Sequence, residues 1–316
     1  MEPNTTNTAQ ALCEVPANYI FIFAYSLVFL VSLVLNCITM RVYFCTNQRV
    51  QSSITVYMKN LAAADFFLCL CLLLRIASYA KNSDIMFNIY CSFGATALYI
   101  NMYASILFME VIAVNRYLKI VRPLETHALQ TVHTARYISA AIWLFLIATS
   151  SIYLILFLLT SWGHDQKLDE FTCESLHSLQ LSLAYKIIHC VTIVVFISVL
   201  ISLTLLYCKT IQKLRQVQFS THTTNSSQTF TKSKRNMQVL IIIFCVCFVP
   251  YHLVRLPYVF IKPLLHDCLA VHAFYILKEL TVLLAALNAS LDPLIYFLFC
   301  RAFRARFNFR ICQTCP

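Results

Sequence analysis

MQVLIIIFCVCFVPYHLVRLPYVFI, residues Met237–Ile261, is a long apolar run whose only permanently charged side chain is Arg255. A helix that crosses a bilayer needs about 20 mostly apolar residues, and this run is long enough. Six further runs also qualify: Asn18–Phe44, Ser52–Tyr79, Asn88–Ile120, Thr134–Leu159, Gln180–Leu206 and Ala270–Phe299. The sequence therefore predicts an all-α membrane protein that is a bundle of seven transmembrane helices.

The composition agrees with a polytopic membrane protein. Of the 316 residues, 60% are hydrophobic and 12% are charged, against about 25% charged residues in soluble domains. The 2 glycines are too few for a glycine-rich phosphate-binding loop. Most of the 15 cysteines lie within apolar runs, so a secreted disulfide scaffold is not indicated.

These runs define the predicted domain organisation. Residues 1–17 form an outer tail, 18–299 the membrane domain, and 300–316 a short cytoplasmic tail with an amphipathic helix. The first run lacks a preceding basic segment and is too long for a signal-peptide core, so we interpret it as a retained helix.

The basic residues predict the orientation. Of the 24 Lys and Arg residues, 17 fall on one side of the seven-helix arrangement. The positive-inside rule makes this side cytoplasmic and leaves the N-terminus outside. The net charge of +11 therefore reflects topology and requires no nucleic-acid partner. A basic cytoplasmic rim also suits membrane lipids that are anionic or an acidic protein partner.

Several residues are candidates for covalent modification. Four cysteines lie on the oxidising outer side, and they allow three pairings: Cys13, Cys91, Cys173 and Cys268. Asn4 starts a glycosylation sequon in the outer tail. Three cysteines follow the last run beside arginines, a setting typical of palmitoylation: Cys300, Cys312 and Cys315.

Motifs in each run resemble those of rhodopsin-like (class A) G-protein-coupled receptors over the whole chain. The matches, in chain order, are Asn36, Leu61–Asp65, Asn115–Tyr117, Trp143, Tyr207, Phe244 with Cys247, Phe248 and Pro250, and Asn288–Tyr296. The resemblance implies coupling to a heterotrimeric G protein and two disulfides, Cys91–Cys173 and Cys13–Cys268. It also implies an activation switch formed by Asn115, Arg116, Tyr117, Tyr207, Phe244, Phe248, Pro250, Pro293 and Tyr296.

Buried polar residues suggest a cation site. Intramembrane carboxylates are expensive and should face the bundle interior. The resemblance places Asp65, Ser105, Asn288, Ser290 and Asp292, with Asn36, around one pocket that binds an allosteric sodium ion. Carboxylate, amide and hydroxyl oxygens suit such a hard cation. The alternative is that both aspartates only hydrogen-bond neighbouring helices. We expect no other cofactor.

Two features depart from the family pattern. Asn115 replaces the usual Asp beside Arg116, and no Asp or Glu occurs between Ser175 and His266 that can substitute for it. Glu110 lies in the middle of the third run. We interpret Glu110 as a protonated filler, while a snorkelling surface group and a link in the switch stay open.

A smaller set of residues resembles the nucleotide (purinergic) receptors that respond to ADP and UDP-sugars. This resemblance lies in Phe248–Tyr258, Lys278–Thr281 and Tyr99–Tyr103. Cationic side chains in a cleft suit a phosphate group. The forked guanidinium of arginine can bind two of its oxygens, and the ammonium of lysine acts as a point charge. The ligand-binding candidates are Arg255, Lys278, His252, Tyr99, Tyr103, Arg75, Lys186 and Glu279. The alternative is that Arg255 and Lys278 pair with Glu279, Asp267 or Glu174 and contact no ligand.

The predicted function is a receptor for an anionic ligand, a nucleotide or nucleotide sugar, that activates an inhibitory G protein. A lysophospholipid or other lipid mediator is the alternative within the same branch. An enzyme is not expected, because the sequence lacks a zinc motif such as His-Glu-Xaa-Xaa-His. A transporter or channel is disfavoured because the chain shows no internal repeat.

Overall fold

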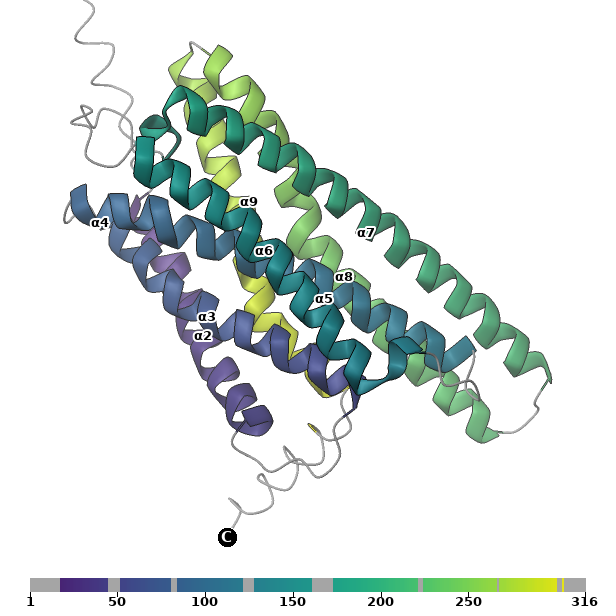
Figure 1. Ribbon diagram of the computed structural model, residues 1–316. Helices are drawn as coiled ribbons and strands as arrows, with labels where there is room; N and C mark the ends of the chain where they lie inside the picture. Colours follow the sequence, from purple (N-terminus) through teal and green to yellow (C-terminus); the bar gives the residue numbers. More distant parts are fainter. Residues whose placement is uncertain are drawn as a thin grey trace, which may run out of the picture.

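The computed structural model describes residues 18–44, 52–80, 84–121, 128–160, 173–220, 224–265, 267–299 and 303. Long helices run side by side as one bundle (Figure 1). They are α2 (Asn18–Phe44), α3 (Ser53–Tyr79), α5 (Ala95–Val121), α6 (Val132–Thr160), α7 (Leu179–Ser220), α8 (Thr224–Ile261) and α9 (Cys268–Phe299). Within these ranges, 7 helical segments are long and apolar enough to cross a membrane. The predicted seven-helix membrane fold is confirmed.

The helix ends differ most from prediction on the fifth and sixth spans. We expected α7 to end at Leu206, but it continues to Ser220. We expected α8 to begin at Met237, but it begins at Thr224. Apolar runs indicate how much of a helix lies in lipid, and both helices extend beyond the apolar part. Of the predicted helix in 300–316, only Phe303 is described; it is helical and buried.

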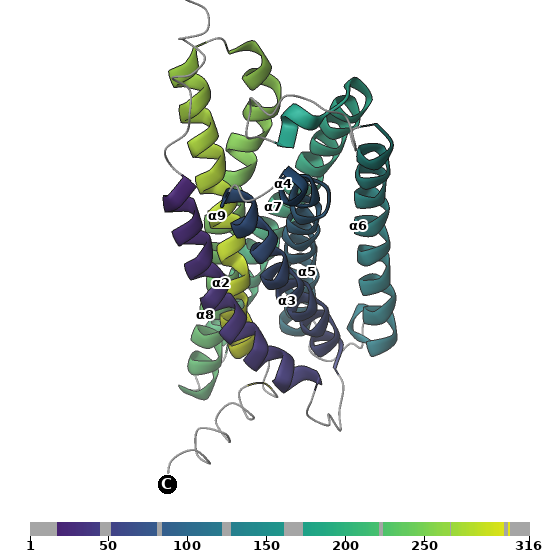
Figure 2. The same cartoon turned by 90° about the vertical axis from the view of Figure 1, so that its left-hand side faces the viewer.

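The helices bury different amounts of surface. α5 lies inside the bundle and has long buried stretches, whereas α6 lies at its edge (Figure 2). The side chains that α6 buries are Ala135, Ser139, Leu146 and Phe157. Trp143 anchors α6 by donating its indole N–H to Asn60 Oδ1 on α3, at 2.9 Å. Exposed leucines and isoleucines on the outer helices face the position of the lipid, which is the expected solvent for them.

The third span begins with an irregular helix. The short α4 (Asp84–Ile89) leads through the π-helical turn η2 (Tyr90–Gly94) into α5. Gly94 is required here, because a Cβ at this position would lie 2.6 Å from Cδ2 of Tyr90. The missing side chain leaves room for the Tyr90 ring, whose hydroxyl accepts a hydrogen bond from Arg75. The π turn therefore places an aromatic ring against a buried cation.

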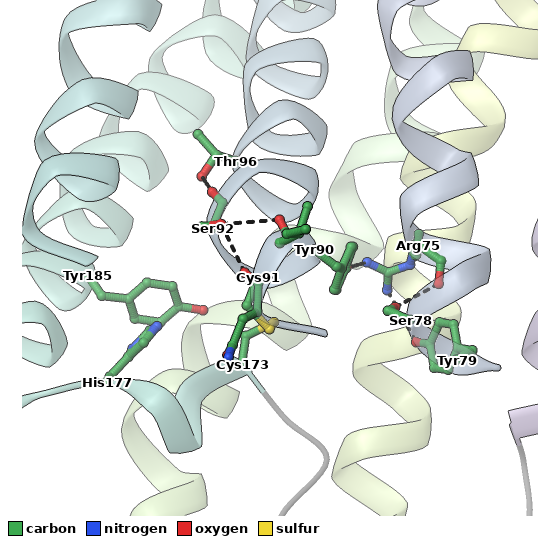
Figure 3. The surroundings of a disulfide bond; sticks show 12 residues. Arg75, Ser78, Tyr79, Tyr90, Cys91, Ser92, Thr96, Cys173, His177 and Tyr185 are labelled. Carbon is green, nitrogen blue, oxygen red and sulfur yellow. Dashed lines mark hydrogen bonds between the residues drawn. A yellow bond between two sulfur atoms is a disulfide. The ribbon is translucent and has the colours of Figure 1, made fainter. Parts of the chain in front are cut away.

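A disulfide fixes this turn to the segment before α7. Cys91 in η2 is bonded to Cys173, which starts the 3₁₀ turn Cys173–Leu176 (Figure 3). The predicted Cys91–Cys173 pairing is confirmed. Cys268 at the start of α9 is also disulfide-bonded. Its predicted partner, Cys13, lies outside the described residues.

Candidate functional site

A cavity opens at the end of the bundle that carries the Cys91–Cys173 disulfide. It encloses about 1470 Å³, counting the part open to solvent, and its walls come from α3, α5, α6, α7, α8 and α9. Six of the eight predicted ligand-binding residues line it: Arg75, Tyr99, Tyr103, Arg255, Lys278 and Glu279. The candidate site is therefore a single cavity that collects residues from distant parts of the sequence.

One wall of the cavity carries a buried ionic group, which we call the carboxylate cluster (Arg75, Tyr79, Tyr90, Lys278 and Glu279). Glu279 Oε1 lies 2.7 Å from Lys278 Nζ, and Oε2 forms a salt bridge with Arg75. The Tyr79 hydroxyl also donates to Glu279. One carboxylate thus serves two cations, and both cations lie at the cavity surface. The pairing of Lys278 with Glu279, which the sequence left as the alternative, is present.

Another part of the wall carries a second group, the arginine cluster (Arg255, Tyr185, His189 and Tyr99). Arg255 donates from Nε to His189 Nε2 at 3.3 Å and from Nη2 to the Tyr185 hydroxyl. Its guanidinium also lies 5.9 Å from the centre of the Tyr99 ring. His189 Nδ1 lies 2.9 Å from the backbone oxygen of Tyr185, so Nδ1 carries the proton and Nε2 accepts from Arg255.

The sequence did not reveal the α7 side of this wall. Tyr185 and His189 are buried on α7, and His177 lies just before that helix (Figure 3). The Tyr153 hydroxyl of α6 and His177 Nε2 are 3.1 Å apart. The available signal was the spacing of Tyr185 and His189, four residues apart on one face of an otherwise apolar helix.

Two predicted ligand residues do not line the cavity. Lys186 follows Tyr185 and is half-buried, but about 100° of helical rotation separates neighbouring residues, so its side chain leaves that face. His252 is buried; its ring stacks on Phe196 with centroids 3.7 Å apart, and its Nε2 lies 3.1 Å from the Tyr103 hydroxyl. His252 therefore packs beneath the cavity while Arg255 reaches it.

The cavity wall nearest α6 is less polar. Leu146, Thr149 and Tyr153 of α6 face Ile188 and Thr192 of α7 there. Within the described part of the chain, this wall carries no permanent charge. The cavity therefore combines a cationic side with an apolar side.

Asp65, Asn288 and Asp292 of the predicted sodium site meet in the middle of the bundle, and Ser105 lies one helical turn along α5 from Asn101. Asp65 accepts from the Tyr296 hydroxyl at 2.7 Å and from Asn101 Nδ2 at 3.3 Å. Asn288 Nδ2 donates to Asp292 Oδ2 at 3.0 Å. Ser290 departs from the prediction, because its hydroxyl lies 2.6 Å from that of Ser32 on α2. Its position, two residues before Asp292, turns it toward α2.

The oxygens of this group fit a hard monovalent cation. Among the predicted sodium-site residues and Asn36, four buried oxygens have no hydrogen-bond partner within the described residues: Asn36 Oδ1, Ser105 Oγ, Asn288 Oδ1 and Asp292 Oδ1. Buried polar atoms ordinarily have partners, so unpaired oxygens beside two carboxyl groups are the donor set that such a cation uses.

Part of the predicted switch, Asn115–Tyr117 with Tyr207, lies toward the other end of the bundle. Arg116 of α5 donates to the backbone oxygen of Phe299, and its guanidinium lies 5.1 Å from the Phe299 ring centre. The neighbouring Asn115 donates instead to Ser53 on α3. Tyr117 and Tyr207 are half-buried. The arginine is therefore held by the end of α9.

The switch aromatics and prolines lie on α8 and α9. Phe244 and Phe248 meet edge to face, with centroids 5.5 Å apart, and both are fully buried. Pro250 lies inside α8 and Pro293 inside α9, where each removes a helical hydrogen bond and permits a bend.

Glu110 has a partner on α7. Its Oε1 accepts a hydrogen bond of 2.5 Å from the Ser202 hydroxyl, and its side chain is half-buried. This contact joins α5 to α7 at mid-membrane depth.

The chain is similar to known proteins over most of its length. The family described as "7 transmembrane receptor (rhodopsin family)" matches residues 35–296. Purinoceptor 14 of Bos taurus is 30% identical over 95% of this chain and 89% of its own length. The G-protein coupled receptor 87 of Mus musculus is 30% identical over 89% of this chain and 77% of its own length. The probable G-protein coupled receptor 34 of Mus musculus is 28% identical over 87% of this chain and 72% of its own length.

Proposed function

The chain belongs to the rhodopsin family of seven-transmembrane receptors, and on this premise we propose that it is a plasma-membrane receptor for a small anionic ligand. The family consists of multi-pass membrane receptors that bind a small molecule and signal through G proteins, and it is not enzymatic. The ligand class that we propose is a nucleotide or nucleotide sugar.

The observation that supports an anionic ligand is the excess of cations in the cavity. Arg75, Arg255 and Lys278 line it, and Glu279 is the one carboxylate among the described lining residues. All four side chains are buried, so water screens their charges weakly. A phosphate group entering between the two clusters would supply the missing negative charge, and Arg255 can contact two of its oxygens.

Aromatic side chains favour a nucleotide among anionic ligands. Tyr99 lies beside Arg255 in the cavity, and Tyr275 lies beside Lys278, whose Nζ is 4.5 Å from the ring centre. A base can stack on such a ring while its phosphates meet the cations. The similarity to a receptor named as a purinoceptor supports the same ligand class.

The apolar wall supports a second candidate, a lysophospholipid. Leu146, Ile188 and Thr192 form a part of the cavity that a nucleotide phosphate does not need. A ligand with one phosphate and one acyl chain would use the cationic side for the phosphate and this side for the chain.

The proposed signalling mechanism is an allosteric shift. Agonist binding between α8 and α9 favours a state in which α8 swings outward below Pro250, and Arg116, Tyr207 and Tyr296 rearrange to admit a G protein. Agonist and G protein then increase each other's affinity reciprocally. We propose the inhibitory G-protein class from the family resemblance.

Further parts of the proposal are an outer N-terminus, a glycan on Asn4 and palmitoylation of the tail. These sites lie outside the described residues: Asn4, Cys300, Cys312 and Cys315. We also propose that Asp65, Asp292, Asn288 and Ser105 hold an allosteric sodium ion. Its single positive charge would offset one of the two carboxylate charges.

The test begins with a screen of nucleotides, nucleotide sugars and lysophospholipids for inhibition of cyclic AMP formation. The agonist found is then titrated against Arg255→Ala, Arg255→Lys and Lys278→Ala at matched surface expression. Loss of one charged donor should reduce potency about 30- to 1000-fold. Lys186→Ala removes a cation outside the cavity and is the matched control. Unchanged potency in Arg255→Ala and Lys278→Ala would refute an anionic ligand.

A further inference from the structure

A second groove lies between α7 and α8 at the Arg116 end of the bundle, far from the ligand cavity. Its polar lining residues are Gln212 and Arg215 on α7 and Lys234 and Gln238 on α8, with Tyr207 and Ile211 on its apolar side. None of these residues lines the ligand cavity. The two helices therefore place one guanidinium and one ammonium group on facing walls.

The surroundings of this groove are strongly basic. Six cations lie on the two helices near it: Lys209, Lys213, Arg215, Lys232, Lys234 and Arg235. The sequence has no acidic residue between Ser175 and His266. Across the described residues, no ion pair involves any of the six. The attraction of this surface for an anion is therefore not cancelled from within the two helices.

The groove lies at the depth of a lipid headgroup. The apolar run of α7 ends at Leu206 and that of α8 begins at Met237, and the residues of the groove lie at these limits or directly on their polar side. Arg215 is exposed and Lys234 is half-buried. Long basic side chains at such positions extend toward the phosphates of the interface.

Apolar side chains continue from the groove toward the middle of the membrane. On α7, Ile201 and Leu205 are 55% and 54% exposed, and they precede Cys208 and Gln212 at helical spacing. On α8, Ile242 is 59% exposed, one turn from Gln238. The surface is therefore cationic at the interface and apolar directly above it, with both parts accessible from the lipid side.

We propose that this groove binds an anionic phospholipid of the cytoplasmic leaflet, with a polyphosphorylated inositol headgroup on Arg215 and Lys234. Its acyl chains lie along Leu205 and Ile242. An acidic soluble peptide would satisfy the cations but would not use the exposed apolar side chains, so the lipid accounts for more of the surface. The inference depends on the cytoplasmic placement of this end and is independent of the agonist.

The first experiment measures lipid binding to the full-length receptor in phosphatidylcholine nanodiscs. A fluorescent phosphatidylinositol bisphosphate is titrated into wild type, Arg215→Gln, Lys234→Gln and the double variant. A basic residue that contacts the anionic headgroup at the membrane surface contributes about fivefold in affinity, so the double variant should bind about 25-fold more weakly. Lys119→Gln, at the exposed inner end of α5, makes the same charge change on another helix and should retain wild-type affinity.

The second experiment separates the lipid from a soluble anion. Free inositol polyphosphate, inorganic phosphate and an acidic peptide compete against the bound lipid, and Leu205→Asn with Ile242→Asn tests the acyl contact. We expect the soluble anions to compete only at much higher concentration and the apolar variants to weaken lipid binding selectively. Equal binding of the headgroup alone, preferential binding of the peptide, or equal effects of Lys119→Gln and Arg215→Gln would each overturn the proposal. Thermal unfolding of every variant verifies that the fold is intact.

Discussion

Asn115 of α5 donates a hydrogen bond of 2.9 Å to the hydroxyl of Ser53 on α3, while its neighbour Arg116 donates to the backbone oxygen of Phe299. The residue that would ordinarily offer a carboxylate to the arginine is thus an amide that joins α5 to α3. Arg116 is held by the end of α9 through a carbonyl and an aromatic ring. Positions 115 and 116 therefore share no charge-assisted contact in this structure.

Asn115→Asp should lower agonist-free signalling. A carboxylate at this position can still accept from Ser53 and adds an anion beside Arg116, which stabilises the inactive arrangement. Even ~1 kcal/mol would reduce the active fraction about fivefold. The measurement is basal guanine-nucleotide exchange on the G protein at equal surface expression. Ser53→Ala, which removes only the hydrogen-bond partner, is the control, and unchanged basal exchange in Asn115→Asp would show that position 115 is neutral.

The helices were predictable because a helix that crosses the bilayer must consist of about 20 mostly apolar residues. Across the residues that the structure describes there, α2 agrees with the predicted run Asn18–Phe44, because almost the whole run is apolar. α8 was predicted to start too late, because residues 224–236 are polar and helical. Hydropathy identifies residues in lipid and carries no information about a helix that continues into water.

The site was only partly predictable for a different reason. Arg255 and Lys278 were identified because a charged side chain in a membrane-spanning helix is energetically costly and therefore indicates a functional site. His189 and Tyr185 escaped notice because tyrosine and neutral histidine are common in apolar helices. Lys186 was chosen for its charge, although the face of α7 toward the cavity belongs to its neighbours. Charge is visible in a sequence, but the rotation of a helix about its axis is set by packing.

Glu279→Gln should destabilise the receptor far more than Lys278→Met. The glutamine leaves two buried cations, Arg75 and Lys278, without their shared carboxylate, and breaking a buried ion pair costs about 3–5 kcal/mol. Lys278→Met leaves the Arg75–Glu279 pair in place. The measurement is the thermal unfolding midpoint of the purified receptor. Equal midpoints for the two variants would show that Glu279 does not hold this cluster together.

Removing the Cys91–Cys173 disulfide should reduce surface expression and agonist response together. The bond spans 82 residues of sequence, and closing such a loop stabilises a fold by about 4–5 kcal/mol in the chain-entropy account. It also holds η2, where Tyr90 meets Arg75. Cys91→Ala, Cys173→Ala and the double variant should be equally impaired. Normal expression and potency in either single variant would contradict a structural role for the bond.

Glu110→Gln should leave expression and signalling within about twofold of wild type. Glutamine has nearly the same shape as a protonated glutamate, carries no charge and retains an oxygen that accepts from Ser202. It should therefore fill the space of an uncharged Glu110 without loss. Ser202→Ala is the companion variant that deletes the other partner. A clear change in basal or maximal signalling in Glu110→Gln would instead identify the α5–α7 contact as a link in the activation switch.

Sodium should lower the basal activity of the receptor through Asp65. If a sodium ion joins Asp65, Asp292 and the unpaired oxygens of Ser105 and Asn288, it stabilises the arrangement in which Tyr296 donates to Asp65. An effector coupled to a two-state switch changes the equilibrium about fivefold or more. Basal nucleotide exchange measured in sodium chloride should therefore fall below that in potassium chloride at equal ionic strength. Asp65→Asn should abolish the difference between the two salts. Ser290→Ala should retain it, because Ser290 contacts Ser32 on α2 and not the residues proposed to hold sodium. A sodium effect that persists in Asp65→Asn at equal expression would place the ion elsewhere.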